Sequence, residues 1–176
     1  HWMVRRQRQM CIRDRITVPL YCLAEGLVLG GISAYANALY PGIANQAIAL
    51  TFGILAALLF LYKSRLIAAT ENFKLGVFSA TFGILIIYVL NLILSLFGVS
   101  FMGPLFGNGL TGILFSLFVI GIASLNLVLD FDFIENGAEQ GAPKYMEWYA
   151  AFGLMITLIW LYIEILNLLM KLRSRR

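Results

Sequence analysis

The chain has 176 residues, of which 61% are hydrophobic and only 12% charged, and its formal net charge is +4. A soluble domain carries about 25% charged residues, so this chain has too few polar side chains to cover a water-facing surface. These values exclude a soluble globular protein and a disordered one, and they indicate an integral membrane protein with one domain.

The amino end differs in charge from the rest of the chain. Its first fifteen residues hold five arginines and one acid, Asp14, and so account for the whole net charge. Residues 10–15 resemble the translation of a sequencing-library adapter, so we expect residues 1–15 to be a non-native tail. The alternative is a juxtamembrane basic cluster that contacts anionic lipid. Residues 16–176 are expected to form a single transmembrane domain.

Five apolar runs follow the tail. Each is about 20 residues or longer, which is enough to cross a hydrocarbon layer of about 30 Å as a helix. The runs are continuous rather than alternating, which favours helices over barrel strands. We therefore predict an all-α, polytopic membrane helix bundle with five transmembrane helices. The runs span residues 16–38, 44–62, 75–97, 110–129 and 145–172.

Proline and glycine separate the runs. Tyr40-Pro41-Gly42 follows the first run, Gly103-Pro104 lies between the third and fourth, and Gly141-Ala142-Pro143 precedes the fifth. Proline lacks a backbone N–H, so it suits these connections. Pro19 is expected in the first turn of its helix, where a missing N–H costs little. All connections are short, so consecutive helices are expected to be antiparallel neighbours.

Small residues recur four positions apart in the first four runs. Such faces let helix backbones approach closely in lipid, so we expect them to pack the bundle. Tyr145, Trp148 and Tyr149 cluster at the start of the fifth run, where an interfacial aromatic belt is expected. The small residues are Gly26, Gly30, Ala34 and Ala38, then Gly53 and Ala57, Gly76 and Ala80, and Gly112 and Ser116.

The distribution of basic residues gives an ambiguous orientation. Lys63, Arg65 and Lys74 flank the connection between the second and third runs, which favours a cytoplasmic position for it. Five crossings, however, would place Lys171 and the arginines after it on the opposite side. Either the fifth segment does not cross fully, or the charge bias is weak, and both alternatives stay open.

Carboxylates lie within the apolar runs, where no basic partner is expected. Glu25 is in the first run, Asp130 at the end of the fourth, and Glu164 in the fifth. A charge in the bilayer interior costs at least about 2.5 kcal/mol and usually marks an ion or proton pathway. Burial and mutual repulsion both favour the protonated form of a carboxyl. We therefore predict a pH-sensing ion pathway at these three residues. The alternative is protonated carboxyls hydrogen-bonded between helices.

Neighbouring polar residues support two of these acids. Asn126 lies four residues before Asp130 and Asn167 three residues after Glu164, in each case on the same helix face. Calcium binds carboxylate and amide oxygens, so Asp130 and Glu164 are the candidate calcium ligands. At 1.5 Å rise per residue, Glu164 lies deeper than Asp130 below the turn that joins their helices, so direct contact would require a tilt or a kink.

Three further acids follow Asp130. Asp132 is assigned as a supporting polar residue of the pathway. Together with Glu135 and Glu139, it is also read as part of a solvated acidic helix face, which is the favoured interpretation.

Four stretches of the chain resemble the bacterial, YccA-type branch of the Bax inhibitor family. They are residues 24–30, 129–135, 141–149 and 161–166, and the resemblance covers about residues 16–176. It implies about seven transmembrane helices, of which this chain holds the last five. It also implies that Asp130 and Glu164 form a pH-sensitive acidic pair beside a calcium-permeable path. In this chain the second acid is Glu rather than Asp, and the two acids are further apart than in the family.

The leading functional hypothesis is a pH-sensitive calcium leak in a bacterial inner membrane, with calcium as the transported ion and no other cofactor. The alternative is a non-conducting membrane regulator, either a partner of a membrane quality-control protease or a self-associating protein. An enzyme is not expected, because the only histidine is His1 and no Ser/Lys dyad lies within a run. Nucleic acid is not expected as a partner, because the excess positive charge is confined to the tail.

Overall fold

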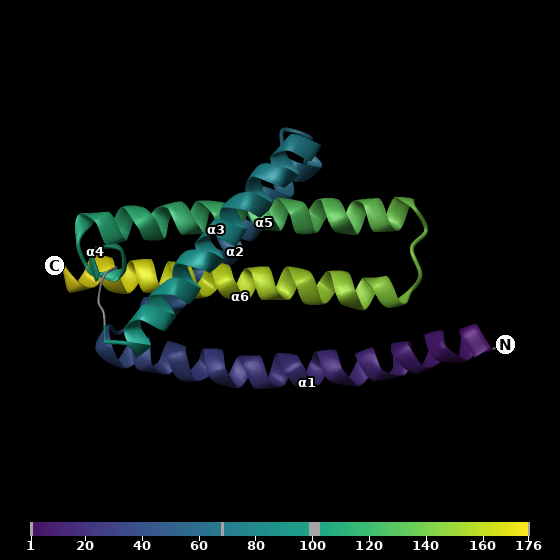
Figure 1. The fold of residues 1–176 in the computed structure, drawn as a ribbon, viewed down its shortest axis with the longest axis horizontal. Helices are drawn as coiled ribbons and strands as arrows, with labels where there is room; N and C mark the ends of the chain where they lie inside the picture. The colour runs from purple at the N-terminus through teal and green to yellow at the C-terminus, as the bar shows by residue number, and fades with distance from the viewer. Residues whose placement is uncertain (1, 68, 99–102, 176) are drawn as a thin grey trace.

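The computed structural model describes residues 2–67, 69–98 and 103–175, with side chains from residue 17 onward except at 104 and 105. Within this part of the chain all regular secondary structure is helical, which confirms the predicted all-α class (Figure 1). The helices are α1 (Trp2–Leu39), α2 (Ile43–Lys63), α3 (Glu71–Leu96), α4 (Gly103–Phe106), α5 (Leu110–Glu139) and α6 (Tyr145–Ser174).

Among the described residues, five of these helices are long and apolar enough to cross a membrane. Their candidate spans have mean hydropathies from 1.4 to 2.4 and lie at Thr17–Leu39 in α1 and along the whole of α2, α3, α5 and α6. The predicted bundle of five transmembrane helices is thereby confirmed. The apolar surface agrees with this assignment: Leu27 and Leu96, for example, are each 80% exposed, and lipid tails would cover them.

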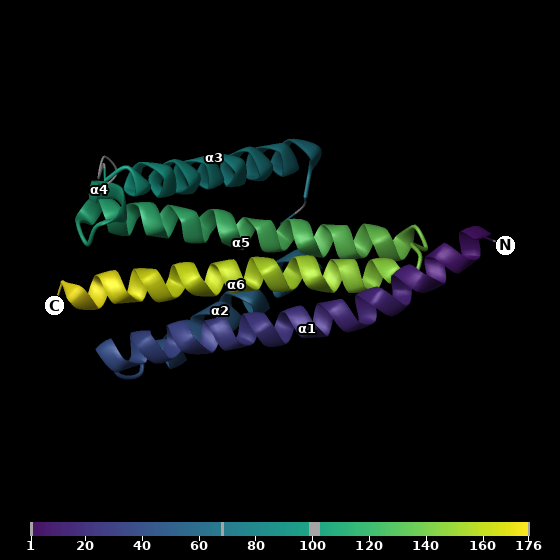
Figure 2. The same ribbon diagram turned by 60° about the horizontal axis from the view of Figure 1, so that its bottom comes forward.

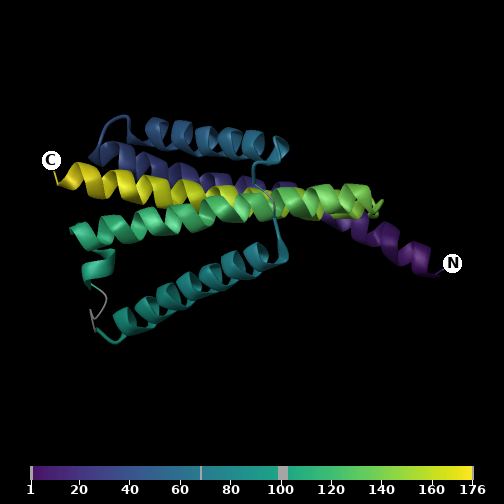
Figure 3. The same ribbon diagram turned by 90° about the horizontal axis from the view of Figure 1, so that it is seen from above.

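Helix α6 lies at the centre of the bundle. It packs along α5 as an antiparallel hairpin and also contacts α1 and α2, while α3 packs chiefly against α5 (Figures 2 and 3). Leu127 on α5 and Leu161 and Leu166 on α6 are fully or almost fully buried in this contact. The hairpin therefore forms the core against which the other helices pack.

The expectation that all consecutive helices are neighbours is wrong for α2 and α3. These two helices lie on opposite sides of the α5–α6 hairpin, and the connection between them passes across α5 (Figure 3). The α1–α2 and α5–α6 pairs are adjacent, as predicted. Gly42, with φ of 82°, makes the tight turn between α1 and α2, and its N–H donates to Asn37 Oδ1 at 2.7 Å.

Helix α1 begins at Trp2, well before the predicted apolar run, so Pro19 lies inside the helix rather than in its first turn. Arg, Gln and Met, which are good helix formers, extend the helix toward the amino end. One face of α1 packs on α6: Ala36 is fully buried, and Ser33 shares a 2.6 Å hydrogen bond with the Tyr162 hydroxyl.

Most of the small-residue faces do not pack the bundle within the described residues, contrary to the expectation. A Cβ added at Gly26, Gly30, Gly53 or Gly76 would meet nothing within 4 Å. In α1 these glycines lie on a different face from the one that contacts α6. The exception is the pair Gly112 and Ser116, which is buried between α5 and α6.

The fifth run is a full-length helix. α6 has 30 residues and runs antiparallel to α5, and the two chain ends lie at opposite ends of the bundle (Figure 1). By length and composition the fifth segment is therefore a candidate for a full crossing, which would leave only a weak charge bias between the two sides.

Candidate functional site

Asp130 lies on α5 and faces α6 at a point where α6 has little side-chain volume. A Cβ added at Gly153 would stand 3.9 Å from Asp130 Oδ1, and Thr157, whose hydroxyl donates to the Gly153 carbonyl at 3.2 Å, interacts with the same carboxyl. The other carboxyl oxygen, Oδ2, is buried and has no hydrogen-bond partner among the described residues. A buried carboxyl oxygen without a donor has room and need for a proton, a water molecule or a cation.

Glu164 lies deeper in the bundle, on α6. Its side chain is only 5% exposed, and Oε1 accepts a 2.6 Å hydrogen bond from the hydroxyl of Tyr88 on α3. The Tyr88 ring is held by two aromatic neighbours, Phe106 on α4 at 5.5 Å and Phe115 on α5 at 6.5 Å between ring centroids. Three elements therefore fix the donor that points at this carboxyl.

The structure does not bring Asp130 and Glu164 together. Asp130 lies level with Gly153 and Thr157, and Thr157 precedes Glu164 by seven residues on α6. Two helical turns correspond to about 10 Å along the axis. Each carboxyl interacts with other groups: Asp130 with Thr157, and Glu164 with Tyr88, Trp160 and Lys171. They are two separate sites along one helix contact.

Lys171 contradicts the expectation that no basic side chain lies inside the bundle. It is 5% exposed, and its Nζ donates to Ser116 Oγ at 2.8 Å and to the Gly112 carbonyl at 3.3 Å. The small residues at 112 and 116 leave space for the long lysine side chain between α5 and α6. Thr157, Glu164 and Lys171 follow one another at seven-residue intervals, so all three lie on the face of α6 that meets α5.

The remaining predicted site residues are dispersed. Glu25 on α1 is half-buried and interacts with Tyr21, one turn earlier. Asn126 donates to Thr81 Oγ1 at 2.7 Å and to the Ile122 carbonyl at 2.9 Å, so it joins α5 to α3 instead of supporting Asp130. Asn167 is half-buried on α6.

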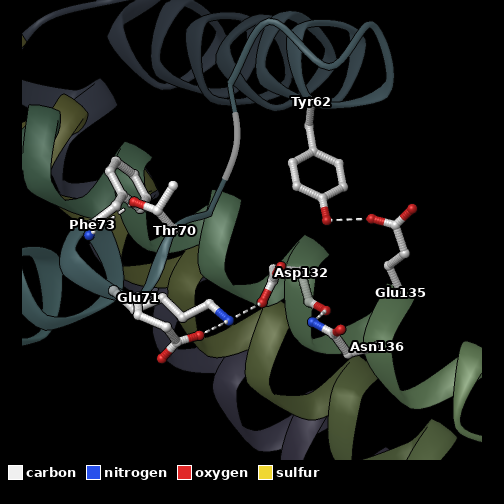
Figure 4. A network of polar contacts seen from close by, with 8 residues as sticks. Tyr62, Thr70, Glu71, Phe73, Asp132, Glu135 and Asn136 are labelled. Atoms are coloured by element: carbon white, nitrogen blue, oxygen red, sulfur yellow. Dashed lines mark hydrogen bonds and ion pairs between the residues drawn. The ribbon is translucent and has the colours of Figure 1, made fainter.

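The acidic end of α5 is more structured than a solvated face. Asp132 forms a 2.8 Å ion pair with Lys74, which also contacts Glu71 at 3.1 Å (Figure 4). Glu135 accepts a hydrogen bond from the hydroxyl of Tyr62 on α2. These contacts hold the ends of α2 and α3 against α5. The prediction of a solvated acid is wrong for Asp132, whose side chain is 19% exposed.

A cavity of about 890 Å³ opens beside this network, between α2, the α2–α3 connection and α5. Asp132, Glu135 and Glu139 contribute its acidic groups, and Lys63 and Arg65 its basic ones. Phe131, the residue after Asp130, forms part of its wall together with Leu154 of α6. Phe131 is thus both a wall residue of the cavity and the sequence neighbour of Asp130, the first buried carboxyl of the α5–α6 contact.

Within the part of the chain that the structure describes, no three His, Cys, Asp or Glu side chains lie close enough to hold a metal ion. The candidate calcium ligands Asp130 and Glu164 each stand alone. A cation bound at either carboxyl would need water or backbone oxygens to complete its coordination shell.

The sequence reasoning missed Tyr88, Thr157 and the position of Lys171. Tyr88 had a detectable signal, since Val77, Thr81, Ile84 and Tyr88 follow helical spacing, and this is the face of α3 that meets α5. Two hydroxyls on one face of an apolar helix indicate polar partners on a neighbour.

The family model described as Bax inhibitor 1 like matches residues 9–174, which include α2 to α6 completely. No curated protein and no solved structure matches the chain.

Proposed function

Because this chain belongs to the Bax inhibitor 1-like family and is a multi-pass membrane protein, we propose that it forms a cation leak pathway controlled by protonation of intramembrane carboxyls. Calcium is the proposed ion. The proposed location is a bacterial inner membrane, in keeping with the resemblance of its carboxyl end to the YccA-type branch.

The observation that carries the proposal is a series of carboxyls at increasing depth along the α5–α6 contact. Asp132, Glu135 and Glu139 line the cavity at one end of the bundle. Asp130 follows at the level of Thr157, and Glu164 lies two turns further along α6. Intramembrane acids in such a series are typical of ion or proton pathways.

Asp130 is the first buried step of this route. Its Oδ2 has no hydrogen-bond partner among the described residues, so when the carboxyl is ionised this oxygen can bind a cation that leaves the cavity. Gly153 opposite keeps space beside the carboxyl. Protonation of Asp130 would remove this charge, and a cation would lose its first ligand inside the bundle.

Glu164 is the second buried step. Its Tyr88 donor satisfies one lone pair of Oε1 and leaves the rest of the carboxyl to bind a cation or a proton. Since a cation and a proton compete for both carboxyls, we expect flux to fall as the pH falls.

Purified full-length chain in liposomes tests the proposal, with a calcium indicator inside and a calcium gradient across the membrane. We expect pH-dependent calcium entry that Glu164→Gln and Asp130→Asn each reduce at least fivefold. Glu147→Gln is the matched control, because Glu147 is exposed in the first turn of α6. Wild-type flux equal to that of protein-free liposomes at every pH would contradict the proposal and favour a non-conducting membrane partner.

A further inference from the structure

Lys171 is a buried cation that the proposed route does not use. Its Nζ is anchored to α5 by two oxygens, the Ser116 hydroxyl and the Gly112 carbonyl. Both partners act as acceptors, which is the environment that an ammonium group requires, because it has donors only. The side chain is 5% exposed, so water does little to screen its charge.

No carboxylate neutralises Lys171 at close range. Among the described residues, the ion pairs within 4 Å are those of Lys74 with Glu71 and Asp132, at the other end of the bundle. Glu164 interacts with Lys171 electrostatically from two turns away on the same face of α6. The positive charge of Lys171 is therefore partly balanced by Glu164, but no ion pair cancels it.

The position of Lys171 along the bundle determines where on the proposed route its charge acts. Its anchors lie near the start of α5, whereas the acidic cavity lies near the end of α5. Because α5 and α6 are antiparallel, the order along their contact is the cavity, Asp130, Glu164 and then Lys171. A cation that enters from the cavity reaches two carboxyls before it meets a fixed positive charge.

We propose that Lys171 is the electrostatic barrier that closes the far end of this cation route. The inference rests on the proposed function and deepens it, since it names the residue that limits passage beyond Glu164. The barrier acts by repulsion, so it opposes a divalent ion twice as strongly as a monovalent one at the same distance. Removal of the charge should therefore raise calcium permeability more than potassium permeability.

The test compares variants of the full-length chain in proteoliposomes under separate calcium and potassium gradients. We expect Lys171→Met to raise calcium flux by about tenfold or more and potassium flux by a smaller factor. Lys171→Arg keeps the charge and should leave the calcium-to-potassium ratio near the wild-type value. A purely structural role of Lys171 would change both fluxes by the same factor.

Variants of Ser116 give a second, independent measurement. Ser116→Asp places a carboxylate beside Nζ, so it should cancel the barrier while the lysine remains and should raise the calcium-to-potassium ratio as Lys171→Met does. Ser116→Ala is the matched control: it removes one hydrogen bond but leaves the charge, so the ratio should stay low. If Lys171→Met fails to fold in detergent, the Ser116 pair decides the question.

The outcomes separate this inference from the proposed function. A conducting wild type in which neither Lys171→Met nor Ser116→Asp raises the ratio would overturn the barrier and leave the leak proposal standing. No flux in the wild type and in every folded variant would overturn the leak proposal and the barrier with it.

Discussion

The Tyr88 hydroxyl of α3 donates a 2.6 Å hydrogen bond to Glu164 on α6, and this bond joins two helices that do not otherwise pack on each other. α3 contacts α5, and α5 contacts α6, so the tyrosine reaches past α5 to the central helix. Phe115 of α5 supports the ring on the way. Any movement of α3 relative to the α5–α6 hairpin therefore changes the donor that holds this carboxyl.

Tyr88→Phe removes the donor and leaves the ring packing intact. We expect the apparent unfolding temperature in detergent to fall by a few degrees, because a hydrogen bond between transmembrane helices contributes about 1 kcal/mol. Exposed Tyr149→Phe is the control and should leave it unchanged. Because the two side chains share this bond, the effects of Tyr88→Phe and Glu164→Gln will not be additive in the double variant. Additive effects would show that the two side chains do not interact.

The closeness of Gly153 to Asp130 predicts a limit on the size of the side chain at position 153 that still permits ion flux. A Cβ at this position would lie 3.9 Å from Asp130 Oδ1, which is ordinary van der Waals contact, so Gly153→Ala should fold and conduct much like the wild type. Alanine also has the better helix propensity, by up to about 1 kcal/mol. Gly153→Leu should fill the space and reduce calcium flux at least fivefold at unchanged expression. Equal flux in both variants would show that the route does not pass this point.

The Lys74–Asp132 pair is expected to fasten the start of α3 to α5. The two side chains are 33% and 19% exposed, so the pair is only partly screened by solvent. We expect Asp132→Asn to lower the free energy of unfolding by up to about 1 kcal/mol, the upper range for exposed ion pairs. Glu71→Gln is the matched control, since Glu71 binds the same lysine but is 86% exposed, and it should have a smaller effect. A larger loss of stability in Glu71→Gln than in Asp132→Asn would show that Glu71, and not Asp132, is the main partner of Lys74.

Hydrophobic runs identified the transmembrane helices because lipid requires continuous apolar surface, and the second, third and fifth runs match their helices closely, whereas α1 begins well before the first run. The fourth run ended too early, since α5 continues as a polar helix to Glu139, where Gln140 and Gly141 end it. Polar residues keep helix propensity but lose the hydropathy signal. Helix neighbours were less predictable, because a short connection such as that between α2 and α3 can cross over a third helix.

Of the candidate site, the sequence could predict only the acidic residues that interrupt an apolar run. Asp130 and Glu164 were found because an acid in an apolar run is costly. Their partners Thr157 and Tyr88 were not, since hydroxyls are common in transmembrane helices and a partner depends on how helices pack. Lys171 was misplaced because its position near the carboxyl end suggested a surface. Its burial depends on small residues in α5, which are far away in the sequence.

The hydrogen bond from Asn126 to Thr81 predicts how firmly α3 is held on α5. The amide nitrogen lies 2.7 Å from the Thr81 hydroxyl oxygen, and the same hydroxyl donates to the Val77 carbonyl at 2.8 Å. Thr81→Val keeps the shape but removes the acceptor, and we expect a loss of about 0.6 kcal/mol, the average for such bonds between transmembrane helices. Thr81→Ser retains the hydroxyl and should behave as the wild type. Reversible unfolding in mixed micelles measures the difference, and equal stability of the two variants would contradict a role for this bond in holding α3.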